Sequence, residues 1–278
     1  MRKVKTIGWY GGKAHLVKHL LRLIPSHKIY LEVFGGGAAL LLSKQPAQLE
    51  IYNDIDSNLY NLFRVIRDDK LFPIFLHKVK WTLYSREEWR RARKSYRYAN
   101  NNPVEKAVRF FITIRQSFAK YTHSWSYSLK EKSPAKSYFA FIDELEALHR
   151  RLRNVQIENL DWKDCMRKYN NEAVWAYIDP PYLKDVRRIK SNVYSHEFSR
   201  EDHEELVEFL LNEWQGKATI SGYKNPIYER LEEAGWIRKD IEIALFASGK
   251  PTTHNPKKRE RDRVVESCLL YTSPSPRD

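Results

Sequence analysis

The sequence predicts an α/β protein built on a parallel, doubly wound sheet. Short apolar stretches typical of buried strands alternate with amphipathic helices, and a Gly-Gly-Gly turn follows the first strand. The 278 residues allow one large α/β domain carrying a smaller insert. The two cysteines, Cys165 and Cys268, lie far apart and favour neither a disulfide scaffold nor a zinc site.

The first elements follow the order expected of such a sheet. Residues 14–24 have helical apolar spacing that ends at Pro25, and residues 29–34 form a buried strand that leads into the glycine turn. A helix is expected to begin within 38–43, a second strand covers 49–54, and a helix with one apolar face follows it. The alternation then stops near Asp68.

The α/β pattern resumes after residue 136. We expect a helix within 141–152, strands at 155–158, 174–178 and 218–221, a helix between Asn225 and Gly235, and a last strand at 241–245. Ser199 and Asp202 form a capping box that opens another helix, which stops near Gly216. His203, in the first turn of that helix, is interpreted as a packing residue, with a functional role as the alternative.

The interrupting segment is basic, aromatic and mostly helical in pattern. Between Lys78 and Lys136 there are 15 Lys or Arg and four acidic residues, so this stretch holds most of the chain's net charge of +14. Phosphate-neutralising cations mixed with stacking rings are typical of a nucleic-acid surface. A solvated helical face over an aromatic core is the alternative interpretation.

The glycine turn and the acid that follows it suggest a nucleoside site. Gly35-Gly36-Gly37 lets backbone N–H groups approach a ligand closely. Asp54 lies 17 residues past Gly37, at the end of the next strand, where a carboxylate can accept bonds from ribose hydroxyls. Leu40 stands where a dinucleotide fingerprint would have its third glycine or alanine, so a nicotinamide cofactor is disfavoured.

The stretch Asp179-Pro180-Pro181-Tyr182 is the most specific chemical signal. It follows a buried strand and therefore lies at the carboxyl edge of the sheet, where α/β proteins bind ligands. Two prolines fix the turn and remove its donors, which leaves a carboxylate, a proline carbonyl and an aromatic ring. This set complements a planar base that carries an NH₂ group, and such a base must be flipped out of a duplex.

Together these segments resemble the family of bacterial and phage DNA adenine methyltransferases that includes the GATC-methylating enzyme. The resemblance spans residues 7 to about 250 in the family's order and rests on five pieces: Gly8-Trp-Tyr-Gly-Gly-Lys13, Leu31-Glu-Val-Phe-Gly-Gly-Gly37, Tyr52-Asn-Asp-Ile-Asp56, Asp179-Pro-Pro-Tyr182 and Ser221-Gly-Tyr223. It implies a Rossmann-like S-adenosylmethionine-dependent methyltransferase sheet with a mostly helical target-recognition insert. The implied domains are a discontinuous catalytic domain (1–67 and 138–267), the insert (68–137) and a disordered tail (268–278).

The resemblance also implies roles for individual residues. Asp179, Pro180 and Tyr182 would be catalytic. S-adenosylmethionine would be held by Trp9, Tyr10, Lys13, Glu32, Phe34, Gly35, Gly37, Asp54, Asp164 and Cys165. Asp164 and Cys165 match the family's Asp-Phe pair against the cofactor's adenine, although Cys165 departs from the usual aromatic residue. The parts of the target-recognition region would be Arg115, Gln116, Ser117, Lys120, Ser124, Trp125 and Tyr127.

The resulting expectation is an adenine-N6 methyltransferase of double-stranded DNA, without a metal or a membrane association, located in the cytoplasm and monomeric or weakly dimeric. An amino-methyltransferase for cytosine N4 or protein glutamine, and a catalytically inactive DNA-binding relative, remain alternatives.

Overall fold

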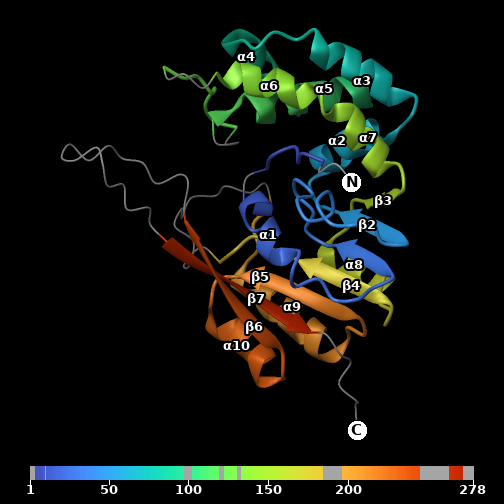
Figure 1. Ribbon diagram of the computed structural model, residues 1–278, viewed down its shortest axis with the longest axis vertical. Helices are drawn as coiled ribbons and strands as arrows, with labels where there is room; N and C mark the ends of the chain where they lie inside the picture. Colours follow the sequence, from blue (N-terminus) through green and yellow to red (C-terminus); the bar gives the residue numbers. More distant parts are fainter. Residues whose placement is uncertain are drawn as a thin grey trace, which may run out of the picture.

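The computed structural model describes residues 4–9, 11–96, 102–118, 122–129, 133–183, 196–244 and 263–271. Its centre is a seven-stranded sheet of order β3-β2-β1-β4-β5-β7-β6 (Figure 1). The strands are β1 (Ile29–Glu32), β2 (Leu49–Asn53), β3 (Val155–Glu158), β4 (Val174–Ile178), β5 (Lys217–Gly222), β6 (Ile237–Ala244) and β7 (Arg263–Tyr271). The first five are parallel, and β7 is antiparallel to both of its neighbours. This confirms the expected α/β class.

The strand order places a crevice beside β1. The chain runs outward from β1 through β2 to β3 and then returns to add β4 on the other side of β1. In doubly wound sheets, ligands bind at such a reversal, outside the carboxyl ends of the strands. Glu32 at the end of β1 is in register with Tyr177 of β4, so the glycine turn and the Asp179 turn leave the sheet side by side.

Two apolar cores cover the two faces of the sheet. Tyr30, Tyr52 and Trp175 point into one core, whereas their neighbours Leu31 and Ile51 point into the other, as the alternation of a strand requires. The first core includes α2 (Ser57–Arg67), α7 (Leu145–Leu152), the short helix α1 (Val17–Leu20) and the insert. The second core includes α8 (Trp162–Lys168), α9 (Arg200–Asn212) and α10 (Pro226–Glu233).

The basic segment folds as a helical layer at one end of the molecule (Figure 1). Its helices are α3 (Leu71–Lys80), α4 (Arg86–Ser95), α5 (Pro103–Gln116) and α6 (Pro134–Ile142). The central helix α5 packs against α2, α3, α4 and α6. Pro103 occupies its first turn and the Asn102 side chain caps it, which accounts for the break expected at this point.

Two of the helices expected near the N-terminus differ from the structure. Residues 38–43 form turns instead of a helix, because Ala38 has a left-handed backbone (φ 54°) and the buried Glu32 accepts the N–H of Leu41. The expected helix at 14–24 is a 3₁₀ turn, η1 (Lys13–His15), followed by only one turn of helix in α1.

The expected boundary of a C-terminal tail at residue 268 is also corrected. Strand β7 continues to Tyr271, and Cys268, Leu269 and Leu270 are buried where β7 pairs with β5 and β6. Residues 272–278 lie outside the described part of the chain. Within the described ranges, no helix combines the length and apolar character needed to cross a membrane.

Candidate active site

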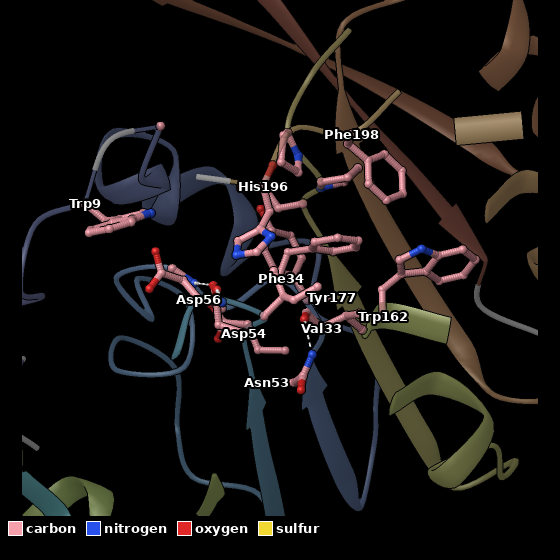
Figure 2. A pocket seen from close by; sticks show the side chains of 18 of the residues that line it. Trp9, Val33, Phe34, Asn53, Asp54, Asp56, Trp162, Tyr177, His196 and Phe198 are labelled. Carbon is pink, nitrogen blue, oxygen red and sulfur yellow. Dashed lines mark hydrogen bonds between the residues drawn. The ribbon is translucent and has the colours of Figure 1, made fainter. Parts of the chain in front are cut away.

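A cavity of about 450 Å³ lies at the carboxyl ends of β1, β2 and β4. The glycine turn after β1, the acids after β2, the Asp179 turn after β4 and the start of α9 all contribute to its lining. Figure 2 shows Trp9 on one side, Asp54 and Asp56 below it, and the rings of Phe34, Phe198 and Trp162 toward the other side. The strand order therefore brings the expected motifs into one cavity.

The glycine turn is shaped by two aromatic side chains. A Cβ on Gly35 would lie 2.1 Å from the ring of Tyr52, so only glycine fits there. Gly36 has a left-handed backbone (φ +48°), and the ring of Trp9 lies against it, 3.0 Å from where a Cβ would stand. Trp9 also contacts Phe110 of α5, at 5.8 Å between ring centroids. One residue thus links the cavity to the insert.

Asp54 is held rigidly at the end of β2. Its Oδ2 accepts the N–H of Gly36 at 2.7 Å, and its Oδ1 accepts the N–H of Asp56 at 2.8 Å. Burial raises the pKa of Asp54 to about 6, although these two N–H groups oppose the rise. Each carboxylate oxygen has a second lone pair, so Asp54 can still accept hydroxyl groups from a ligand.

Asp179 belongs to a charged cluster at the deeper side of the cavity. Lys13 Nζ lies 3.0 Å from Asp179 Oδ1 and 3.6 Å from Glu266 Oε2 on β7. The Tyr182 hydroxyl donates to the same Glu266 oxygen at 3.2 Å, and Lys13 Nζ lies 4.3 Å from the centre of the Tyr182 ring. Burial raises the pKa of Asp179 to about 6 against the opposing effect of Lys13.

One oxygen of Asp179 keeps acceptor capacity. Its Oδ1 is buried, and the Lys13 ammonium at 3.0 Å is the one partner found for it among the described residues. A buried carboxylate oxygen in this state is stabilised by a ligand that brings an N–H or O–H group. Asp179 and Tyr182 both line the cavity, so the turn places a carboxylate beside an aromatic ring there.

The cavity has a strongly acidic lining. Lys13 is its only Lys or Arg among the described lining residues, against seven acids: Glu32, Asp54, Asp56, Asp161, Asp179, Glu197 and Asp202. Such a field attracts a cation and opposes a pyrophosphate. No group of three His, Cys, Asp or Glu in the described ranges has the arrangement of a metal site.

Asp164 and Cys165, the pair expected to contact the cofactor's adenine, do not line the cavity. Asp164 is exposed on α8 and Cys165 is fully buried in the core, and neither lines the cavity. Asp161 and Trp162, three residues earlier, do line it, and Trp162 supplies the aromatic ring that the expected pair lacked. Asp161 caps α8, so the helix begins one turn before the expected contact and rotates Cys165 into the core.

Two residues expected to bind DNA are interior residues of the insert. Gln116 is fully buried; its Oε1 accepts the N–H of Ser85 and its Nε2 donates to the carbonyl of Leu83. Ser117 is also buried and accepts the indole N–H of Trp89 at 2.9 Å. In this structure their side chains hold the insert together and present no polar group to a duplex.

The other residues expected to contact DNA differ in where they lie. Arg115 donates to the Ile7 carbonyl at 2.8 Å and lies over the ring of Phe141, so it joins the insert to the N-terminal segment. Trp125 and Tyr127 stack at 6.3 Å with Arg86 over both rings, and Tyr127 is exposed. Residues 124–126 pair with 116–118 through two backbone hydrogen bonds. Tyr10 and Lys120 lie outside the described residues.

Several residues that line the cavity or contact its charged cluster were not predicted from the sequence. Asp161-Trp162 carried a usable signal, an acid followed by an aromatic residue after a short strand. Phe198 and His196 line the cavity without any recognisable motif. Glu266 lies near Lys13 and Asp179 because β7 pairs antiparallel with β5. No local sequence pattern predicts that pairing.

The sequence is similar to a known protein family and to several named proteins. The model of the D12 class N6 adenine-specific DNA methyltransferase family matches residues 9–242. A type II methyltransferase of Lactococcus lactis subsp. cremoris is 27% identical over 93% of this chain and 92% of its own length. The DNA adenine methylase of Escherichia coli K12 is 22% identical over 90% and 97%. The DNA adenine methylase of Serratia marcescens is 26% identical over 72% of this chain and 74% of its own length.

Proposed function

The chain belongs to the D12 class of N6 adenine-specific DNA methyltransferases, and we propose that its cavity binds S-adenosylmethionine and that its Asp179 turn holds the amino group of a flipped adenine. The carrying observation is that Asp54, Asp179 and Tyr182 line one cavity at the reversal point of the sheet. The relatives come from bacteria and a bacteriophage, and we infer that the enzyme acts on DNA in a bacterial or phage-infected cytoplasm.

The lining fits S-adenosylmethionine on charge and shape. This cofactor carries a sulfonium, an ammonium and a ribose, and the acidic lining with Lys13 as its only described Lys or Arg suits a cation. Asp54 retains lone pairs for ribose hydroxyls, and the ring of Trp162 with Phe34 and Phe198 supplies an apolar wall for a purine. When bound, the cofactor supplies an electrophilic methyl group on sulfur.

The chain's own groups act on the adenine. The carboxylate of Asp179 and the carbonyl of Pro180 would accept the two N–H bonds of the amino group, which frees its nitrogen lone pair for attack. Tyr182 would stack on the base, with its hydroxyl held by Glu266. Asp179 is also placed to receive the proton that the methylated amino group releases. Orientation and electrostatics supply the acceleration.

We further propose that residues 68–137 recognise the target sequence. The paired segments 116–118 and 124–126 carry the exposed Phe118 and, just beyond, the exposed Tyr127 beside Arg86. Rings and cations on one surface suit a nucleic acid. Gln116 and Ser117 would act by fixing this surface, since both are buried beneath it.

The experiment incubates the purified chain with methyl-labelled S-adenosylmethionine and DNA from a host that lacks DNA methylation. Digestion to nucleosides should recover the label in N6-methyldeoxyadenosine. Label in N4-methyldeoxycytidine would give the enzyme a different base, and no transfer by a folded protein that binds the cofactor would contradict the proposal.

A further inference from the structure

The turn that carries Asp179 has few backbone hydrogen-bond donors of its own. Pro180 and Pro181 have no N–H, so two of its four residues cannot donate a hydrogen bond to the rest of the protein. Its carbonyl oxygens are the groups through which donors from other elements can hold it. His203 lies in the first turn of α9, and its Nε2 is 3.1 Å from the carbonyl oxygen of Pro181.

His203 is itself fixed by its surroundings. Its side chain is almost fully buried, and its Nδ1 lies 2.8 Å from the Tyr228 hydroxyl on α10. The imidazole meets Phe198 edge to face at 4.7 Å, and Phe198 meets Phe34 of the cavity wall at 5.4 Å. Tyr228 is tightly seated too, since a Cβ on Gly222 would lie 2.6 Å from its ring.

The contacts determine which nitrogen carries the proton. Burial lowers the pKa of His203 to about 4, so the ring is neutral at physiological pH and has one N–H. The Pro181 carbonyl can only accept, so Nε2 is the donor. Nδ1 is then an acceptor and takes the hydroxyl proton of Tyr228. A directed chain of two hydrogen bonds thus runs from α10 through α9 to the turn.

We propose that His203 is a positioning residue for methyl transfer, which holds the Pro181 carbonyl so that Asp179 and Tyr182 meet the adenine in the reactive geometry. The inference rests on the proposed function of that turn. It follows from the shared backbone: Asp179 and Tyr182 each lie within two residues of the carbonyl that His203 fixes. Displacement of reacting groups by about 1 Å costs on the order of 100-fold in rate.

Three variants separate positioning from folding. His203→Phe keeps a ring against Phe198 but removes the donor. The double variant His203→Phe with Tyr228→Phe also removes the hydroxyl that would otherwise be buried without a partner, and replacing both partners by apolar groups of similar shape has a small effect on stability. His203→Gln restores an amide N–H at about the reach of Nε2.

The measurements are kcat, the KM for S-adenosylmethionine, and thermal unfolding, on DNA that the wild-type enzyme methylates. We expect both Phe variants to lose on the order of 10- to 100-fold in kcat with the cofactor KM nearly unchanged, and His203→Gln to recover much of the loss. A folded double variant with wild-type kcat, or a His203→Gln variant as slow as His203→Phe, would overturn the inference.

Nitrogen-15 NMR of the wild-type imidazole tests the geometry without any activity. The expected signature is a neutral ring protonated at Nε2 that does not titrate between about pH 5.5 and 8. A ring protonated at Nδ1 would overturn the inference even if a variant failed to fold. Because the wild type is assayed first, a chain that methylates no DNA contradicts the proposed function, whereas an active chain with a dispensable His203 contradicts only this inference.

Discussion

The ammonium nitrogen of Lys13 lies 3.0 Å from Oδ1 of Asp179, and both side chains are largely buried. Burial alone would lower the pKa of Lys13, but the carboxylates of Asp179 and Glu266 offset it and leave that pKa raised. Lys13 in turn limits the rise in the pKa of Asp179. The N-terminal segment therefore sets the charge of the acid at the end of β4.

This pairing gives the first prediction, a pH dependence of turnover. The pKa of Asp179 is raised to about 6 by burial, and the acid must be ionised to receive the proton from the adenine amino group. We expect kcat/KM for DNA to rise as the pH increases through about 6. Lys13→Met removes the opposing cation, so the acid limb should move to higher pH. A limb that stays in place or moves lower would contradict the pairing.

The second prediction concerns Asp179 itself. Asp179→Ala removes the acceptor for the amino group but leaves the glycine turn and Asp54 intact. We expect kcat to fall on the order of 100- to 1,000-fold, with cofactor affinity mostly kept. The matched control is Asp143→Asn, which removes the charge of an exposed acid at the end of α6. Its kcat should equal that of the wild type. Wild-type turnover in Asp179→Ala would remove Asp179 from the mechanism.

The third prediction tests the position of the cofactor's purine end. Asp161 lines the cavity and Asp164 does not, yet both are exposed acids at the start of α8. Asp161→Asn keeps a good helix cap, so its effect reports on the ligand and not on the helix. By calorimetry with S-adenosylhomocysteine we expect Asp161→Asn to bind about 10-fold more weakly than the wild type. Asp164→Asn should bind with the wild-type affinity. The reverse order would support the expectation from the sequence.

The fourth prediction uses the buried carboxyl of Glu32. Burial raises its pKa to about 8, against bonds from the Tyr30 hydroxyl and the Leu41 N–H. Between its ordinary value and about 8 the folded state binds more protons than the unfolded state, so stability falls as the pH rises. Glu32→Gln cannot ionise and should lose this component. Unfolding temperatures at pH 5 and 8 should therefore differ less in Glu32→Gln than in the wild type.

Much of the sheet was predictable because its strands are short buried runs that end in motifs. In parallel α/β sheets, loops at the carboxyl ends of neighbouring strands lie side by side. The order of β1, β2 and β4 and the presence of Asp54 and Asp179 in one cavity follow from this rule. The capping box at Ser199 and Asp202 appears as expected, because its two hydrogen bonds are local. Residues whose position depends on local chemistry were thus within reach of the sequence.

Features that depend on distant pairing were not predictable. The side of α8 that faces the cavity depends on where Asp161 caps the helix, and as a result Asp161 and Trp162 line the cavity and Asp164 and Cys165 do not. Glu266 joins Lys13 through an antiparallel strand near the end of the chain, and His203 reaches Pro181 through the packing of α9 against the turn. Gln116 has the polarity of a DNA contact but was buried by its neighbours in the insert.

The most direct measurement of the central claim is expression in a host without DNA methylation, followed by modification-sensitive sequencing of its genomic DNA, for the wild type and Asp179→Ala side by side. We expect N6-methyladenine at a fixed short motif in cells that express the wild type, and no N6-methyladenine there in cells that express Asp179→Ala. Methylated cytosine, no modified base from a folded wild-type protein, or equal adenine methylation by Asp179→Ala would contradict it.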